Sequence, residues 1–239
     1  MSGRKRPWLR WLIGGVAVIV VAAVAGPFVY IHFIEGSAPA PFRLRPSASA
    51  SGSATGTQPA SADAGSLAGT WAIASGSQAG YRVQEVLFGQ QHTAVGRTSS
   101  VAGHLTVAGT SVTAAGFTVQ MDTVRSDASQ RDAQFDGRIM DTSAYPAGTF
   151  TLTSPISLGA IPATGAVRSY TAHGNLTLHG TTRPVTFTLN AERTASGIEV
   201  SGSIPVLFAT WHIPNPSFAG VVTTQDHGLL EFLLTLRKS

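Results

Sequence analysis

The sequence predicts an all-β fold: an antiparallel body of about eight short strands, closed as a barrel or packed as a sandwich, with one short helix. From Gly69 onward large apolar residues alternate with polar ones, which is the two-residue period of half-buried strands. Gly, Pro and Asn separate these runs at turn positions. Charged residues make up only 12% of the chain, whereas Gly, Ser, Thr and Ala are abundant, a composition typical of β-rich proteins.

Six runs show the alternation most clearly, and in each of them large apolar side chains recur at every second position on one face. This pattern predicts antiparallel strands with a solvated outer side. A closed sheet of about eight strands has an interior just wide enough for side chains or for one small ligand. The periodicity therefore leaves two possibilities open, a filled core and an apolar pocket. The runs are residues 117–122, 149–153, 175–178, 185–190, 198–201 and 229–236.

One segment departs from the two-residue period and predicts a short helix over roughly residues 129–140. Gln130 follows Asp127 by three positions, as in a capping box. Phe135 and Ile139 are four residues apart and would share one face of the helix. A Tyr-Pro pair then ends the element.

The N-terminal part predicts a single membrane-spanning helix over residues 11–34. No Lys, Arg, Asp or Glu occurs between Arg10 and Glu35, and a spanning helix needs about 20 mostly apolar residues. Because basic residues cluster only in residues 1–10, the positive-inside rule places this tail in the cytoplasm and the rest of the chain outside the cell membrane. The alternative is a signal peptide cleaved after the small-x-small sequence that ends at Ala25.

The remaining chain divides into a linker over residues 35–68 and a folded domain over residues 69–239. Ser, Ala, Pro, Gly and Thr dominate the linker, and such a composition predicts disorder. The domain carries ten basic and ten acidic residues. A neutral domain argues against nucleic-acid binding, which needs a basic surface. The absence of cysteine excludes disulfides and thiolate metal sites.

Four stretches of the domain carry a distinctive order of residues: 71–73 (WAI), 131–135 (RDAQF), 145–150 (YPAGTF) and 174–185 (GNLTLHGTTRPV). They resemble the YceI-like family, which consists of exported lipocalin-like proteins that bind polyisoprenoids. Residues 131–135 and 145–150 together resemble one family signature, residues 174–185 resemble its GxLTIxGxTxPV hairpin, and residues 71–73 resemble its first strand. The resemblance covers the whole domain. The family usually carries an Asp and then a His-Ser pair after the opening Trp, and this chain lacks them.

The resemblance implies an antiparallel lipocalin-like barrel whose interior holds a long isoprenoid chain, such as a quinone tail or a polyprenyl lipid. It raises the pocket above the filled core. Arg131, on the helix near the barrel opening, is a candidate contact for a quinone carbonyl or a phosphate head group. The candidate pocket residues are the inward apolar set: Phe117, Val119, Phe150, Leu152, Leu176, Leu178, Phe187, Leu189 and Phe232.

These observations together predict a membrane-tethered, extracytoplasmic binding protein that sequesters or transports an isoprenoid lipid. The alternatives are a structural cell-envelope barrel with a filled core and an enzyme that acts on isoprenoid lipids. We expect no catalysis, because the metalloprotease helix motif and the Gly-x-Ser-x-Gly nucleophile elbow are both missing. The histidines lack metal-ligand spacing, so no metal and no covalent cofactor is expected.

Overall fold

The computed structural model describes residues 38–44, 66–87, 89–217 and 222–239. The strands in this part of the chain form a single antiparallel sheet. They are β1 (Gly69–Ile73), β2 (Gln78–Leu87), β3 (Gln90–Thr98), β4 (Val101–Ala108), β5 (Ser111–Gln120), β6 (Ala147–Leu152), β7 (Ile156–Ser157), β8 (Val167–Leu178), β9 (Thr181–Arg193), β10 (Ile198–Leu207), β11 (Val222–Thr224) and β12 (His227–Lys238).

Eight of these strands close into a barrel, in the order β1-β4-β5-β6-β8-β9-β10-β12. The barrel closes where β1 pairs with the C-terminal half of β12, with Trp71 opposite Lys238 and Ile73 opposite Leu236. The predicted all-β antiparallel barrel of about eight strands with one short helix is therefore confirmed. All six alternating runs lie in strands except for the ends of the first two, where Met121–Thr123 forms a 3₁₀ turn after β5 and Thr153 follows the end of β6.

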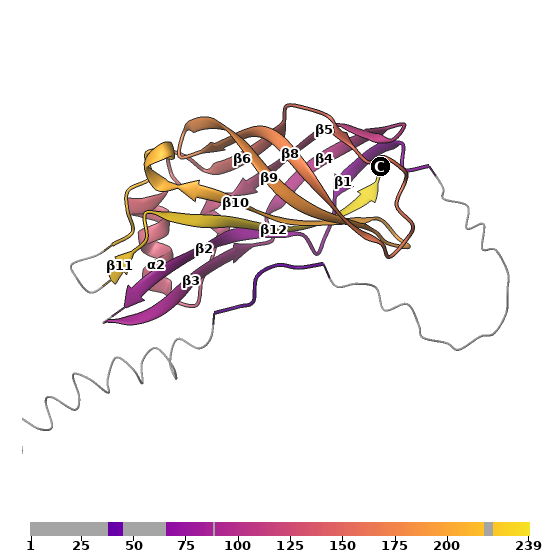
Figure 1. Ribbon diagram of the computed structural model, residues 1–239. Helices are drawn as coiled ribbons and strands as arrows, with labels where there is room; N and C mark the ends of the chain where they lie inside the picture. The colour runs from indigo at the N-terminus through magenta and orange to yellow at the C-terminus, as the bar shows by residue number, and fades with distance from the viewer. Residues whose placement is uncertain (1–37, 45–65, 88, 218–221) are drawn as a thin grey trace, which may run out of the picture.

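β2 and β3 extend one end of the barrel beyond the closed circuit. β2 pairs with the N-terminal half of β12 on one side and with β3 on the other. The helical segment lies beside this extension, while β1 and the C-terminus lie at the opposite end (Figure 1). We call the end that carries the helical segment the mouth.

The helical segment has two parts, α2 (Ser129–Gln134) and a single π-helical turn, η3 (Phe135–Ile139). Met140 N–H donates to Phe135 O, five residues back, at 2.9 Å. The position of the predicted helix is correct, but its regularity and its cap are not. The N-cap is Ala128, which makes no side-chain cap hydrogen bond. Asp132 instead accepts bonds from Ser126 N–H at 2.8 Å and Ser126 Oγ at 2.7 Å.

The core follows the two-residue period of the strands. Leu176 is 2% exposed and Phe150 is 4% exposed, and both point into the barrel between polar neighbours that face solvent. Trp71, at the end opposite the mouth, donates its indole N–H to the carbonyl of Leu67 at 2.8 Å. Leu67 is itself buried, so the folded domain begins slightly before the predicted boundary at Gly69.

A short stretch of the predicted linker lies against the barrel. Residues 38–44, which we call the strap, run in extended form along β2 and β3 (Figure 1). Arg82 donates to the carbonyl of Pro39 at 2.6 Å, and Arg97 donates to the carbonyl of Ala40. The Arg97 guanidinium also lies 4.0 Å from the ring centroid of Phe42. The prediction of disorder is therefore wrong for the strap.

The predicted membrane-spanning segment, residues 11–34, lies outside the described residues. Within the described ranges no helix is long and apolar enough to cross a membrane.

Candidate functional site

Two cavities lie inside the barrel among the described residues, and the one at the mouth, cavity 1, has a volume of about 130 Å³. Leu176 and Leu178 of β8 line its wall together with Ile204 of β10. Phe135 and Met140 close it from the helical segment. Strands thus supply the wall and the π turn supplies the cover, because the five-residue repeat of η3 directs both Phe135 and Met140 toward the cavity.

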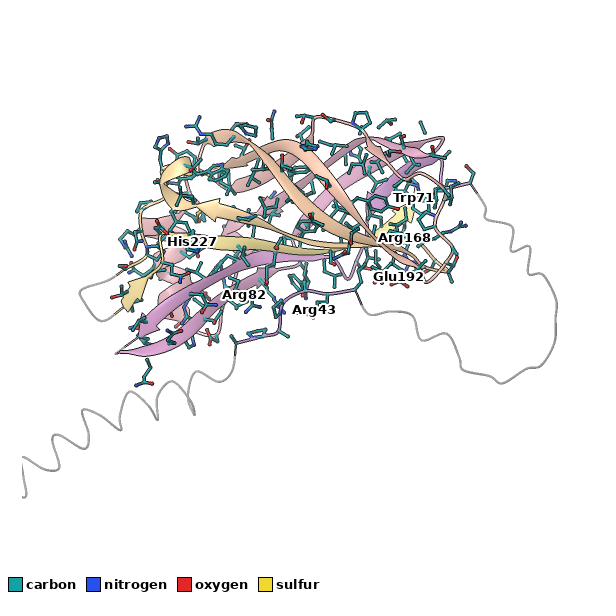
Figure 2. All side chains as sticks on the ribbon, viewed as in Figure 1. Arg43, Trp71, Arg82, Arg168, Glu192 and His227 are labelled. Atoms are coloured by element: carbon teal, nitrogen blue, oxygen red, sulfur yellow. The ribbon has the colours of Figure 1, made fainter. Side chains whose placement is uncertain are left out.

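Cavity 2 lies toward the end of the barrel that holds β1 and has a volume of about 120 Å³. Leu152 of β6, Leu189 of β9 and Leu234 of β12 line it. Glu192 also lines it and is only 1% exposed. Figure 2 places Glu192 on the same side of the molecule as Trp71, away from His227 at the mouth.

All nine apolar residues predicted from the sequence line one cavity or the other. Phe117 and Phe232 line both. The expected single pocket is instead a pair of cavities that meet at these two rings. Val119, Leu176 and Leu178 line cavity 1 only, whereas Phe150, Leu152, Phe187 and Leu189 line cavity 2 only.

An aromatic stack holds the helical segment over cavity 1. The rings of Tyr81, on β2, and Phe135 lie 5.1 Å apart with an interplanar angle of 17°. Gly96, opposite Tyr81 on β3, leaves room for this ring, because a Cβ there would lie 2.3 Å from Tyr81 Cε1. Burial raises the pKa of the Tyr81 phenol well above its usual range, so the hydroxyl keeps its proton at neutral pH.

A small ionic network lies beside this stack. Glu85 of β2 faces inward and lies 3.4 Å from an Arg131 guanidinium nitrogen and 3.0 Å from His92 Nδ1. Arg131 forms a second ion pair with Asp127, one helical turn earlier. The Arg131 side chain is 15% exposed and lines cavity 1, as the prediction of a head-group contact requires. Its charge is shared between two carboxylates.

The two-residue alternation of the sequence also marks some residues that line cavity 1 and that we did not predict. Tyr81, Val83 and Glu85 continue a two-residue alternation, so all three could have been placed on the inner face of β2. Met140 has no such signal, because its inward position depends on the π turn. Among the described residues, no group of three or more His, Asp or Glu side chains could hold a metal ion.

Comparison with known proteins agrees with this geometry. The model of the YceI-like domain matches residues 71–236. A polyisoprenoid binding domain from Saccharophagus degradans, implicated in plant cell wall breakdown, superposes with a TM-score of 0.59 at 18% identity, over 71% of this chain and 98% of that one. BcnA of Burkholderia cenocepacia has a TM-score of 0.49 at 17% identity, over 65% and 95% of the two chains.

A YceI protein of Campylobacter jejuni gives a TM-score of 0.41 at 12% identity, over 56% of this chain and 80% of that one. No curated protein matches the sequence. The family model spans well over half of the chain and includes the mouth and nearly all the residues that line the two cavities. The chain therefore belongs to the YceI-like family.

Proposed function

We propose that the barrel binds the apolar chain of an isoprenoid lipid and sequesters or carries it outside the cytoplasm. The observation that supports this most is the pair of internal cavities, whose walls are almost entirely apolar side chains. A dry apolar cavity is stabilised by a hydrocarbon ligand, because no water has to be removed from polar groups. The Saccharophagus degradans domain, a polyisoprenoid binding domain with the same fold, supports the same class of ligand.

The charges at the mouth favour a neutral head group over a phosphate. Arg131 already lies between Glu85 and Asp127, and Asp132 adds a third carboxylate beside them. A phosphate placed there would meet more negative than positive charge. A quinone carbonyl needs only a donor, and the protonated Tyr81 hydroxyl and the Arg131 N–H groups supply donors in this region. We therefore propose an isoprenoid quinone in preference to a polyprenyl phosphate.

The same geometry supports binding rather than catalysis. Glu85 is the acidic side chain at the inner end of the mouth network, and its carboxylate already faces both His92 and Arg131. A general base must reach the proton that it abstracts. A carboxylate held in this way serves to fix the network that positions α2.

The location of the protein follows from the sequence alone and is part of the proposal. Residues 11–34 would anchor the chain in the cell membrane with residues 1–10 in the cytoplasm. The barrel would then face the compartment outside, beside the membrane where isoprenoid lipids are dissolved.

The test is to identify the lipid that co-purifies with the full-length chain. We expect organic extraction and mass spectrometry to find a prenyl lipid in roughly stoichiometric amount. Detergent-bound membrane lipids also accompany any anchored protein, so the measurement needs a matched control. Leu178→Trp, which fills cavity 1 and keeps the N-terminal segment unchanged, is that control.

The proposal requires the prenyl lipid to be abundant with the wild-type chain and depleted with Leu178→Trp. Equal amounts in both would mean that the lipid is bound outside the barrel. A wild-type chain that carries no prenyl lipid and takes up neither menaquinone nor polyprenyl phosphate would support the filled-barrel alternative.

A further inference from the structure

Four phenylalanine rings form a closed circuit across the barrel interior. Phe117 on β5 lies 5.4 Å from Phe150 on β6, centroid to centroid, and Phe150 lies 5.3 Å from Phe187 on β9. Phe187 lies 5.9 Å from Phe232 on β12, which returns to Phe117 at 5.6 Å. Every ring thus contacts two others. Phe117 and Phe150 are paired across the neighbouring strands β5 and β6, whereas β9 and β12 lie farther round the barrel. We call this set the phenylalanine ring.

Two glycines on the inner faces of other strands make room for the phenylalanine ring. A Cβ on Gly174 of β8 would lie 2.3 Å from Phe150 Cε2. A Cβ on Gly202 of β10 would lie 2.6 Å from Phe232 Cζ. Both distances are far below van der Waals contact, so these two rings occupy space that side chains would otherwise fill. The phenylalanine ring is therefore a specifically packed feature of the fold.

The phenylalanine ring lies where the two cavities meet. Phe117 and Phe232 line both cavities, whereas Phe150 and Phe187 line only cavity 2. The cavities measure about 130 and 120 Å³. Each is close to the size that holds one benzene molecule, roughly 150 Å³, and even together they are smaller than the roughly 300 Å³ of the smallest drug-sized sites.

The volumes of the two cavities limit how much of a prenyl chain can enter the barrel. A chain of a few isoprene units can occupy cavity 1 and extend out of the mouth. A chain can bury more of its length only if it continues into cavity 2, and to do so it must pass the phenylalanine ring. Passage requires the rings to leave their mutual contacts and adopt other rotamers, since the intact circuit occupies the junction.

We propose that the phenylalanine ring is a gate that selects isoprenoid ligands by chain length. This inference rests on the proposed lipid-binding function. With the gate closed, cavity 1 accepts a short prenyl chain at equilibrium. With the gate open, the same chain path extends through both cavities and encloses more of a long chain, whose remaining units extend out of the mouth. The gate therefore controls the rate at which long chains enter and leaves short chains unaffected.

Phe187→Leu tests the gate most directly. Phe187 contacts two members of the phenylalanine ring but does not line cavity 1, so its truncation opens the circuit and leaves the short-chain site intact. Transfer of radiolabelled farnesol and solanesol from donor vesicles to the full-length chain in micelles would be measured. Leu178→Trp gives the blank for uptake by the micelle. We expect Phe187→Leu to raise the association rate of solanesol at least about tenfold and to change that of farnesol less than about twofold.

Two controls separate a gate from added room. Leu189→Ala enlarges cavity 2 but keeps all four rings, so the gate predicts a much smaller effect on the solanesol association rate than that of Phe187→Leu. Phe208→Leu alters a phenylalanine that lines cavity 1 only, so it should change farnesol and solanesol binding together. If Phe187→Leu does not fold, Phe187→Trp serves in its place and should slow solanesol alone.

The measurements distinguish failure of the gate from failure of lipid binding. Equal effects of Phe187→Leu and Leu189→Ala on solanesol would overturn the gate while leaving lipid binding intact. The same would follow if a change at Phe187 altered farnesol and solanesol in parallel or altered neither. A wild-type chain that takes up neither prenol would overturn the proposed function and the gate with it.

Discussion

Replacing Leu178 by tryptophan separates a ligand cavity from a packed core. Leu178 is 4% exposed and lines cavity 1. In a close-packed core, enlarging such a residue forces strain that costs about 1–3 kcal/mol. Here the extra ring can enter an adjacent cavity of about 130 Å³. That volume is close to the roughly 150 Å³ known to hold benzene, so we expect the free energy of unfolding to change by less than about 1 kcal/mol.

Leu178→Trp should reduce ligand binding strongly, although it changes stability little. The new indole occupies the space that a prenyl chain would use, so uptake should fall at least tenfold, which corresponds to about 1.4 kcal/mol. Urea unfolding followed by circular dichroism measures the first quantity, and a farnesol titration measures the second. Leu87→Trp is the matched control, because Leu87 is buried but lines neither cavity.

The control should lose about 1–3 kcal/mol of stability and bind farnesol normally per folded molecule. The reasoning would be refuted if Leu178→Trp behaved in the same way. A loss of several kcal/mol with unchanged binding would mean that Leu178 belongs to a filled core and that the lipid binds elsewhere.

Three further predictions follow from other parts of the molecule. Gly202→Ala should lower the free energy of unfolding by about 1–3 kcal/mol in urea, because its Cβ would lie 2.6 Å from the ring of Phe232. Tyr81→Phe should make stability less sensitive to alkali, as measured by urea unfolding at neutral and alkaline pH. Protease added to intact cells should release a fragment that begins between residues 36 and 66, as identified by N-terminal sequencing.

Each of these predictions has a control variant or an outcome that would contradict it. Gly137→Ala should not destabilise, since its Cβ would meet no atom within 4 Å. Burial raises the folded pKa of Tyr81 above the unfolded value of about 10, so its stabilisation is complete below that pH and is lost as the pH rises further. Equal alkaline sensitivity in Tyr81→Phe would contradict this. A barrel protected from protease until lysis would contradict the topology, and a mature N-terminus at Gly26 would indicate a cleaved signal peptide.

The residues of the barrel wall could be predicted because side chains alternate between the two faces of a strand, which gives the sequence a period of two. Phe150 and Leu152 share a face of β6 whatever the neighbouring strands are, so their inward orientation needed no knowledge of the fold. The same rule applied to Tyr81 and Glu85 would have predicted two residues of the mouth. Family resemblance then supplied the barrel closure that periodicity leaves undetermined.

The phenylalanine ring and the strap were not predictable, for related reasons. The ring depends on contacts between strands that are distant in sequence, and on the absence of a side chain at Gly174 and Gly202. The strap has the composition of a disordered segment. Its order comes from Arg82 and Arg97, which are 43 and 57 residues away from the carbonyls that they contact. The pattern of neighbouring residues in the sequence does not indicate partners that lie so far away along the chain.

The strap also determines which contacts of the barrel bear a pulling force on the chain first. A pull on the chain N-terminal to residue 38 reaches the barrel first through the carbonyls bound by Arg82 and Arg97, on the outer face of β2 and β3. Arg82 is in turn paired with Glu231 of β12 at 2.8 Å, so the load spreads over three strands. Only after these contacts separate does tension reach β1 and the seam with β12 that closes the barrel. The contacts of the strap thus shield the joint on which closure depends.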